Sequence, residues 1–427
     1  MRSKKPLILP IGLDIGQDSV KLLQLEVRDG RLAVRAAARQ AMDPALWDKA
    51  GASDDDRRRA VAAAAAAVRA LARGEGFSGR AVIAAVPREG LHVKNLRVPL
   101  TAGGDFAAAV AAEAKLSFPF DVERAKVRYL PAGQVRQGAD VRHEVIALAA
   151  KNDDLDEYLE QLAPAGVRVE SLDAEPCALF RAANLFTPPE ERDELQVLVE
   201  VGLRRTQVVI GRGKQISFIK TIDAGGLALH AAVSRKLGIS LEEARALRRR
   251  VAEEPTERSP RDPVRRAVID AGRSTLADLA RDVSLCLRYH AVTFRGQRPH
   301  RVRLLGGEAF DPQLQAALSA ALALPVQVGR VDANLDTAAM SPNDTRGGLC
   351  DWAVALGLAL KRLPDPSGPS SGKVRAYRAS PVDLKRILPA FLAAAGAEAK
   401  PPREGLIASG AADVSKPADA PEERGKP

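Results

Sequence analysis

Apolar residues near the N-terminus form two runs, Leu7–Leu13 and Val20–Leu25, which a short polar segment separates. Two apolar runs joined by a small polar turn predict a β-hairpin. The same kind of pattern predicts a third strand at Leu32–Ala41, a helix at Asp54–Arg73 and a buried strand at Ala81–Val86. Strands that alternate with helices in this way predict an α/β fold.

The segment from Arg88 to Val169 predicts a smaller α+β subdomain, because its pattern follows the order strand, helix, two strands and helix. The expected strands are Leu91–Val98, Arg124–Pro131 and Glu144–Ala150, and the expected helices are Phe106–Leu116 and Leu155–Leu162.

The chain from Glu170 to Leu363 predicts another α/β unit. Gly12–Leu25 and Glu200–Ile219 both have the pattern strand, polar turn and strand, which indicates an internal repeat. From Pro364 onward the chain has too little apolar surface to fold alone. Strands are expected at Leu195–Val201, Thr206–Ile210, Gln215–Ile219 and Val302–Leu305, and helices at Asp223–Lys236, Leu241–Val251, Leu276–Arg288 and Leu314–Ala321.

Composition narrows the class of protein. A chain of 427 residues is long enough for two or three domains. Its three cysteines are far apart, which argues against a disulfide framework or a zinc site and favours a reducing cytoplasm. We find no apolar run long enough to span a bilayer, and we reject a signal peptide.

The net charge of +10 is unevenly placed along the chain. Ser234–Arg303 holds 17 Lys or Arg residues against 9 Asp or Glu residues. This excess suits an anionic partner or an acidic membrane leaflet, and equally a solvated helix face. Nucleic acid is a poorer match, because no aromatic residues interleave with the arginines.

The turn of the first hairpin carries candidate chemistry. Backbone N–H groups in the segment from Gly16 to Ser19 can form a nest that binds an anion, and Lys21 adds a positive charge. Asp14, at the end of the first strand, can hold a hydrated Mg²⁺. The sharper interpretation is a phosphate and magnesium site, and the simpler one is a turn that only closes the hairpin.

Two later segments look like further walls of the same site. Glu200–Thr206 places an acid and a glycine where a strand ends, and Leu304–Ala309 places Gly306 and Gly307 between a buried strand and a helical region. Glycine lets a ligand approach the backbone closely, and the start of a helix suits anions.

In this order, the three segments resemble the phosphate-1, phosphate-2 and adenosine motifs of the actin-like ATPase superfamily. Other segments resemble the PilM family of type IV pilus assembly proteins, and the FtsA-like cytoplasmic part of type II secretion GspL is similar. The resemblance covers roughly residues 8–361. The segments that carry the PilM resemblance are Pro87–Gly90, Phe106–Phe120, Val169–Pro176, Ile222–Gly226, Leu237–Ala244 and Ala353–Leu360.

The resemblance implies a two-lobed, actin-like (ribonuclease H-like) fold with a small α+β subdomain inserted in the first lobe. The implied division is a first lobe over residues 1–87, an FtsA-like 1C insertion over 88–169, a return to the first lobe over 170–194, a second lobe over 195–363, and a mostly disordered tail over 364–427.

The resemblance also implies a site for ATP and Mg²⁺ in the cleft between the lobes. Asp14 would be the metal-binding and a catalytic residue, and Asp173 or Glu175 would orient the attacking water, although Glu175 could instead cap a helix. The residues implied to face the nucleotide are Gly16, Gln17, Asp18, Ser19, Lys21, Glu200, Gly202, Thr206, Gly225, Gly226, Gly306 and Gly307.

Three positions of that implied site depart from the family pattern. Glu200 stands where the family usually has Asp, Glu308 replaces a third glycine, and Leu227 replaces a polar residue. One extra methylene moves a carboxylate by about 1.5 Å, and catalytic placement tolerates errors of only roughly 0.5 Å. We therefore expect that nucleotide binding is weakened or absent, and that the chain is at most a slow ATPase or else a pseudo-ATPase.

The function that the resemblance implies is a cytoplasmic scaffold at the inner face of the cytoplasmic membrane. It would bind the N-terminal tail of a bitopic, PilN-like membrane protein in a groove between the first lobe and the insertion. Contacts with an assembly ATPase and peripheral membrane association through the partner are further implications, for a type IV pilus or a type II secretion system.

Two other classes of protein remain as alternatives. A small-molecule kinase of the same superfamily would need a polar substrate-binding segment, and the first lobe shows none. An FtsA-like filament protein would need a C-terminal amphipathic helix, and the only candidate, Val382–Leu392, contains Pro389. Because that segment also loosely resembles a PilN-like docking peptide, the tail is a candidate occupant of the partner groove.

Overall fold

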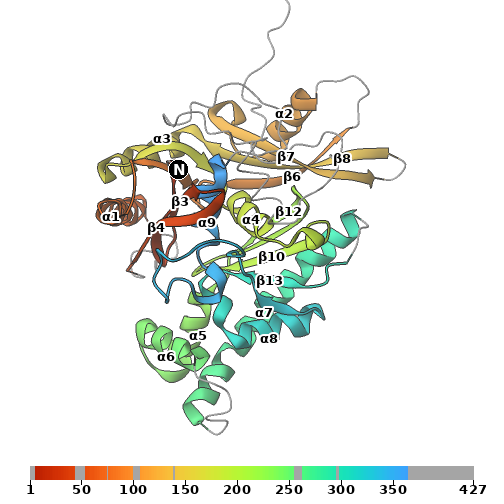
Figure 1. Ribbon diagram of the computed structural model, residues 1–427. Helices are drawn as coiled ribbons and strands as arrows, with labels where there is room; N and C mark the ends of the chain where they lie inside the picture. Colours follow the sequence, from red (N-terminus) through yellow and green to blue (C-terminus); the bar gives the residue numbers. More distant parts are fainter. Residues whose placement is uncertain are drawn as a thin grey trace, which may run out of the picture.

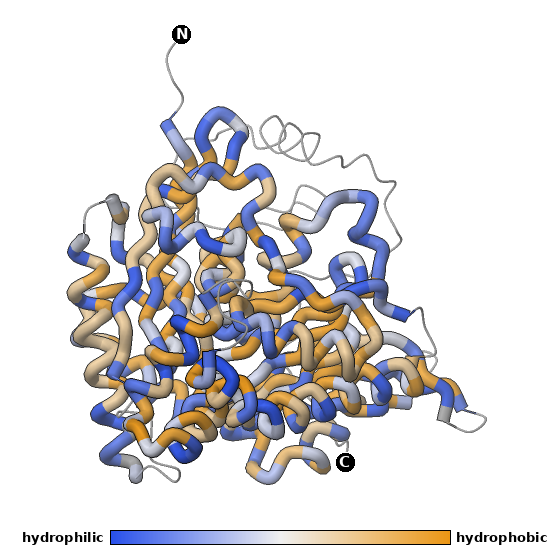
Figure 2. The backbone as a smooth tube through the Cα atoms, turned by 90° about the horizontal axis from the view of Figure 1, so that it is seen from below, coloured by the Kyte–Doolittle hydropathy of each residue, from blue (hydrophilic) through white to orange (hydrophobic). Residues whose placement is uncertain are grey.

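The structure is a computed structural model that describes residues 5–43, 53–74, 76–99, 106–137, 140–253, 262–294 and 298–363 (Figure 1). The expected tail over 364–427, with its segment Val382–Leu392, lies outside these residues. Figure 2 shows hydrophobic stretches running through the interior and hydrophilic stretches gathering on outer loops. Within the described ranges, no helix is long and apolar enough to cross a membrane.

The first sheet contains the predicted hairpin. Its antiparallel strands pair Asp14 with Lys21 and Gly12 with Leu23. The order is β4-β3-β2-β5-β9, and β1 pairs with β3 beyond the end of β2. The strands are β1 (Leu7–Ile8), β2 (Ile11–Ile15), β3 (Ser19–Arg28), β4 (Arg31–Ala41), β5 (Ala81–Ala85) and β9 (Arg168–Asp173).

The second sheet repeats this strand order. It runs β12-β11-β10-β13-β14, so each sheet has an antiparallel meander followed by two parallel strands. The matching order supports the internal repeat that the sequence indicates. The strands are β10 (Leu195–Val201), β11 (Thr206–Arg212), β12 (Gln215–Ile222), β13 (Val302–Leu305) and β14 (Val326–Val328).

A third, antiparallel sheet has the order β6-β8-β7. Its strands are β6 (His92–Pro99), β7 (Ala125–Gln137) and β8 (Asp140–Lys151), and the helix α2 (Phe106–Ser117) covers one face. The other face contributes Ile146 and Leu148 to the main core, and β7 lies beside β12.

Helix α3 (Asn152–Leu162) packs with the first sheet rather than with the third. Its Tyr158 and Leu162 share a core with Leu13 of β2 and with α1 (Asp54–Ala72). The sequence grouped this helix with the insertion because it follows β8 directly, whereas its apolar face is buried against α1.

The second lobe carries α5 (Gly226–Leu237), α6 (Leu241–Glu253), α7 (Pro263–Phe294) and α8 (Pro312–Leu322). Helix α7 begins at Pro263 rather than at the expected Leu276, because its buried face continues upstream through Val268 and Gly272. A proline at the start of a helix costs no hydrogen bond, so it does not shorten the helix.

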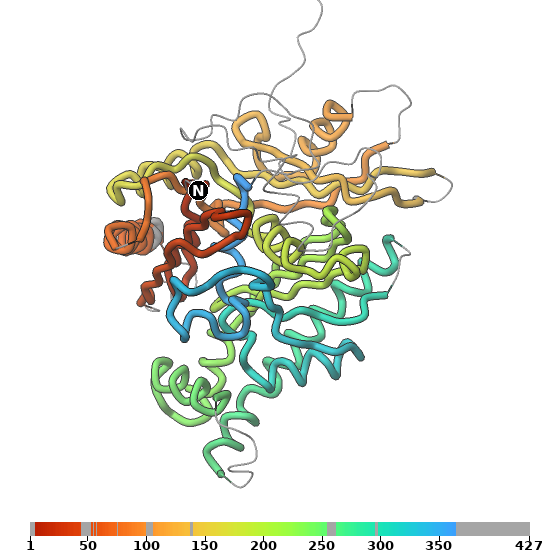
Figure 3. The backbone as a smooth tube through the Cα atoms, viewed as in Figure 1, coloured from red at the N-terminus to blue at the C-terminus, as the bar shows by residue number. Residues whose placement is uncertain are grey.

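Two short helices connect the lobes. These helices are α4 (Glu175–Leu185) and α9 (Ala353–Ala359). They cross closely, because a Cβ at Gly357 of α9 would lie only 1.9 Å from the carbonyl oxygen of Ala178 of α4. A Cβ at Gly12 of β2 would likewise lie 2.0 Å from the carbonyl oxygen of Ala355. Figure 3 shows α9, in blue, against the red N-terminal strands. The 3₁₀ turns are Val122–Arg124, Ala163–Ala165, Pro189–Glu191, Gly307–Phe310, Arg346–Leu349 and Leu360–Arg362.

Candidate functional site

The turn of the first hairpin is closed by its own backbone. The N–H of Gly16 donates to the carbonyl oxygen of Ser19 at 3.0 Å, and Ser19 itself is buried. The side-chain amide of Gln17 donates to Glu89 at 3.4 Å. One N–H group of the expected anion nest is therefore already used within the turn.

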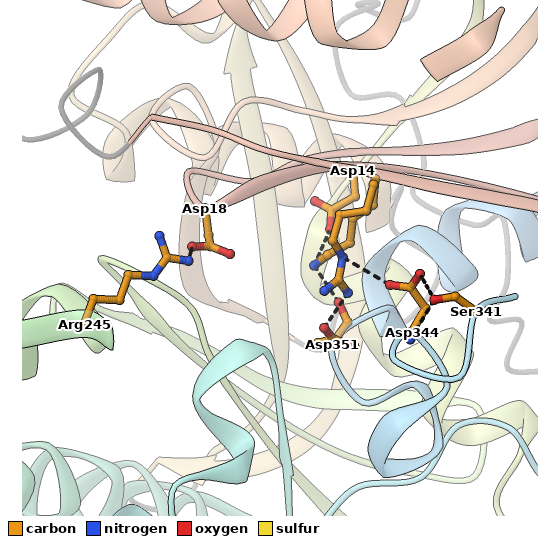
Figure 4. Close-up of polar contacts among 8 residues, drawn as sticks. Asp14, Asp18, Arg245, Ser341, Asp344 and Asp351 are labelled. Carbon is orange, nitrogen blue, oxygen red and sulfur yellow. Dashed lines mark hydrogen bonds and ion pairs between the residues drawn. The ribbon is translucent and has the colours of Figure 1, made fainter. Parts of the chain in front are cut away.

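Asp14 and Lys21 face each other on neighbouring strands, with Lys21 Nζ 3.8 Å from Asp14 Oδ2. Lys21 also donates to the carbonyl oxygen of Asp351 at 2.6 Å, and the Asp351 carboxylate binds Arg39 at 2.5 Å. Figure 4 shows Asp14 near Asp351 of the loop that leads into α9. The charge of Lys21 is thus directed to the chain's own backbone.

Asp18 reaches across to the second lobe. Its carboxylate pairs with Arg245 of α6, as Figure 4 shows. This ion pair connects the turn of the first hairpin to the outer helices of the second lobe.

Arg88 lies at the centre of the pocket between the lobes. Its guanidinium pairs with Glu175, the first residue of α4, and lies 3.9 Å from Glu200 Oε2 at the end of β10. Burial disfavours the charge on Arg88, but the attraction of Glu175, Glu200 and Asp14 outweighs it and holds the pKa of Arg88 above its usual range. Arg88 is therefore the counter-charge of Glu175 and Glu200, whereas Asp14 also has Lys21 beside it.

Burial raises the pKa of Glu175 to about 7, against the opposing attraction of Arg88, and the negative charges of Glu200 and Asp14 add to the rise. Burial also raises the pKa of Glu200. The second carboxylate oxygen of Glu175 has no hydrogen-bond partner among the described residues. This acid is therefore close to its protonation midpoint near neutral pH.

The pocket around Arg88 is a small space of about 370 Å³. Residues of both lobes form it, so its shape depends on how the lobes sit together. Its lining residues come from the connection between β5 and β6, from β6 itself, from the start of α4 and from the second sheet with its first turn. They are Val86, Arg88, Leu91, Val93, Glu175, Glu200, Arg205, Gln207 and Thr221.

The turn after β10 is packed tightly against the start of α5. A Cβ at Gly225 would lie 2.4 Å from the carbonyl oxygen of Gly202, and a Cβ at Gly202 would lie 3.1 Å from Arg88 Nη1. The hydroxyl of Thr206 is buried and donates to the carbonyl oxygen of Ala224 at 2.7 Å. Thr206 thus supports this turn and does not present its hydroxyl to the cleft.

The loop after β13 places a charged side chain beside α5. A Cβ at Gly226 would lie 2.2 Å from Glu308 Oε1, and Arg248 of α6 binds Glu308 at 2.9 Å and Asp311 at 2.7 Å. His230 stays neutral beside Arg248, because burial and that arginine lower its pKa to about 3. The carboxylate of Glu308 is therefore held in place next to Gly226.

The two glycines before Glu308 differ in their surroundings. Gly306 has a φ of 87°, and a Cβ there would lie 2.5 Å from the carbonyl oxygen of Val201. A Cβ at Gly307 would meet no atom within 4 Å. Gly306 is thus required by the backbone, whereas Gly307 borders open space.

Asp173 has a different setting from the other candidate acids. Its carboxylate lies 3.0 Å from Arg181 of α4 and 3.1 Å from Lys361, and it accepts the N–H of Ala174. These partners join the end of β9 to the connecting helices. The structure therefore brings together Asp14, Glu175 and Glu200 around Arg88, and it ties Asp173 to the junction of the lobes.

Three arginines of the site were not predicted from the sequence. Arg88 lies in the segment Pro87–Gly90, which carried the resemblance but no assigned role. Arg245 and Arg248 belong to an arginine-rich helix whose charges could as well be solvated. Their spacing of three places them on one face of α6, and this was the available signal.

Comparison with known proteins places the chain in a family. Residues 12–363 match the family described as type IV pilus assembly protein PilM. A solved PilM–PilN type IV pilus biogenesis complex has a similar chain, with a TM-score of 0.67 and 22% identity, over 83% of this chain and 99% of that one. This likeness shows the two-lobed actin-like ATPase fold with a small inserted subdomain, as the sequence predicts.

Two further solved structures are similar to this chain at lower scores. The ethanolamine utilization protein EutJ from Carboxydothermus hydrogenoformans has a TM-score of 0.47 and 17% identity, over 84% of this chain and 92% of that one. The cytoplasmic domain of EpsL from the type II secretion system of Vibrio cholerae has a TM-score of 0.29 and 13% identity, over 50% and 70%. On the match of residues 12–363, the chain belongs to the PilM family of type IV pilus assembly proteins.

Proposed function

We propose that the chain is a scaffold at the inner face of the cytoplasmic membrane, with a nucleotide cleft that its own side chains have weakened. The observation that carries this proposal is the ion-pair cluster of Arg88 with Glu175 and Glu200. A cleft whose charges are paired with one another offers less to a ligand, because the ligand must first break those pairs.

The residues at the opposite end of the cleft also fit a nucleotide poorly. The carboxylate of Glu308 occupies the space beside Gly226. Glu308 directly follows Gly306 and Gly307, which the family resemblance places at the nucleoside. Arg248 and Asp311 hold it there. A fixed negative charge at this point opposes a polyphosphate ligand.

The phosphate end of the cleft has little to offer an anion. Lys21 donates to the backbone at Asp351, Asp18 is paired with Arg245, and the N–H of Gly16 is used within its own turn. ATP with Mg²⁺ would therefore bind weakly, with Asp14 as its metal ligand, and we derive no hydrolytic step from this arrangement.

The partner we propose is the cytoplasmic tail of a PilN-like membrane protein. The similar chain in the PilM–PilN complex is covered over 99% of its length, which supports the same kind of partner for this chain. We place the tail in a groove between the first lobe and the inserted sheet. The proposed boundaries are residue 87 for the first part of the first lobe, 169 for the insertion, 194 for the return to the first lobe and 363 for the second lobe. The packing of α3 on α1 favours counting α3 with the first lobe.

Two experiments test the two halves of the proposal separately. Titration calorimetry of the full chain with Mg-ATP should show no binding in the micromolar range, and micromolar affinity would refute the weakened cleft. A pull-down with an immobilised tail of the membrane protein encoded next to this chain should retain it, with a scrambled tail as the control. Failure of the pull-down alone would refute the scaffold role and leave the cleft proposal standing.

A further inference from the structure

The outer face of α7 changes character along its length. In its first part, exposed arginines pair with acids one turn away: Arg273 with Asp270 at 2.6 Å and Arg281 with Asp278 at 3.0 Å. After Asp282 the acids stop. Val283–Arg303 contains five arginines and no Asp or Glu.

Large apolar side chains appear where the acids end. Leu285 is 53% exposed, Tyr289 43% and Val292 78%. Residues at i, i+4 and i+7 lie on one face of a helix, so these three form a single stripe. The described part of the chain has only three other large apolar residues that are exposed. They are Leu116 of α2, Leu159 of α3 and Val264 at the start of α7, so they do not form a second stripe.

The stripe is flanked by positive charge. Arg288 follows Leu285 by three positions, so it lies on the same face, and Arg298 is exposed just beyond the helix. Lys220 of β12 is exposed, and β12 lies against α7. Asp282, three positions before Leu285, also lies near this face and is close to Arg281. The positive charge at the C-terminal side of the apolar stripe complements a negatively charged surface that also has an apolar interior.

The stripe is held in a fixed position by the protein beneath it. The ring of Tyr289 lies 5.7 Å from that of Phe218, and the ring of His290 lies 4.8 Å from that of Phe294. Ser217 and His290 are 2.9 Å apart in a hydrogen bond. The helix lies along the outside of the second lobe, beside β12 and β7 (Figure 1).

We propose that the α7 face formed by Leu285, Arg288, Tyr289 and Val292 docks directly on an anionic phospholipid surface. A short convex stripe inserts a few side chains at the boundary between headgroups and acyl chains, and arginines beside it bind the anionic headgroups. Tyrosine suits this boundary because one end of its side chain is apolar and the other polar. The contact adds to the proposed scaffold role and does not depend on the partner tail.

Vesicle sedimentation with the full chain tests this docking. We expect the chain to sediment with phosphatidylcholine vesicles that contain phosphatidylglycerol, and not with phosphatidylcholine alone. Raising the salt from about 0.1 M to 1 M shortens the screening length from about 10 Å to 3 Å and should release the chain. Absence of binding to the anionic vesicles, or equal binding to both kinds, would overturn the proposal.

Variants locate the contact. Leu285→Gln combined with Val292→Gln should weaken vesicle binding by about tenfold, because two apolar side chains no longer insert. Arg288→Glu should weaken it by about fivefold or more. Leu116→Gln on α2 is the matched control, since Leu116 is 83% exposed outside this face, and it should leave binding unchanged.

A second copy of the chain is the competing occupant of the face. Light scattering without vesicles distinguishes the two, because a dimer covering this face would dissociate in the Leu285→Gln, Val292→Gln variant. A monomer at all concentrations supports the lipid contact, and a dimer lost in that variant overturns it. Circular dichroism confirms that each variant is folded before it is scored.

Discussion

Arg88 and Glu175 form an enclosed ion pair, although Arg88 comes from the connection between β5 and β6 and Glu175 begins α4. Glu200 approaches the same guanidinium from the second lobe. Arg88 and its two acids therefore join three parts of the chain: the connection that leads into the inserted sheet, the connecting helix α4 and the second lobe. The energetic weight of these ion pairs can be tested directly.

Replacing Arg88 should destabilise the chain strongly. In Arg88→Ala the buried carboxylates of Glu175 and Glu200 lose their counter-charge, and breaking such a pair costs about 3–5 kcal/mol. Arg88→Lys keeps the charge and should cost less. Urea unfolding followed by circular dichroism measures both, and a loss below about 1 kcal/mol for Arg88→Ala would contradict the central role of this residue.

The stability of the chain should depend on pH through Glu175. Its pKa is about 7 in the folded chain and about 4.3 when unfolded, so the folded state binds the proton more tightly. The resulting stabilisation is fully present below about pH 4.3 and is lost as the pH rises through 7. Unfolding curves of Glu175→Gln against the parent from pH 4.5 to 8 should show a flatter profile for the variant. Parallel profiles would exclude Glu175 as the titrating group.

The crossing of α4 and α9 should tolerate no added methyl group. In Gly357→Ala the new Cβ would lie 1.9 Å from the backbone oxygen of Ala178, so the two helices must separate. Such overpacking costs about 3 kcal/mol. Gly307→Ala, where a Cβ meets no atom within 4 Å, is the matched control and should change the melting temperature little.

The ion pair between Asp18 and Arg245 should matter for the spacing of the lobes more than for stability. Both side chains are substantially exposed, and pairs of this kind contribute less than about 1 kcal/mol. A double-mutant cycle with Asp18→Ala and Arg245→Ala should give a coupling in that range. Asp18→Lys introduces repulsion and should raise the radius of gyration in X-ray scattering, and an unchanged radius would argue against a link across the cleft.

Removing Glu308 should improve nucleotide binding. Glu308→Gly frees the space beside Gly226 and leaves Arg248 paired with Asp311, so the fold should lose only about 1 kcal/mol. We expect calorimetry with Mg-ATP to detect binding in this variant. Glu308→Gln separates the effect of charge from that of volume, and no gain in either variant would mean that Glu308 is not the obstacle.

Much of the fold could be predicted from local pattern. Two apolar runs and a polar turn predict the hairpin of β2 and β3. The same pattern at Glu200–Ile219 predicts the antiparallel strands of the second sheet. The start of α7 could not be predicted, because the segment from Pro263 to Leu276 has few large apolar residues and is buried through Val268 and Gly272. The packing of α3 on α1 could not be predicted either. The apolar face of α3 fits the first sheet or the third sheet equally well by its sequence pattern, and only the folded chain selects between them.

The assignment of site residues to a nucleotide stays a prediction, whereas the close packing at its glycines is visible in the structure. A Cβ at Gly225, Gly226 or Gly306 would lie within 3.0 Å of a neighbouring atom. The partners of Arg88 and Asp18 are 87 and 227 positions away in sequence, and no local pattern encodes such pairs. The roles of Asp173 and Glu175 in orienting an attacking water stay predictions.

The packing of α9 has a consequence for synthesis of the chain. Its residues Ala355 and Ala359 close directly over Gly12 of β2, so the last described helix completes the core of the first strands made. The N-terminal lobe must therefore leave the ribosome with part of its apolar surface uncovered and wait for nearly the whole chain to follow. Truncations before Trp352 should accumulate as aggregates rather than as a free first lobe.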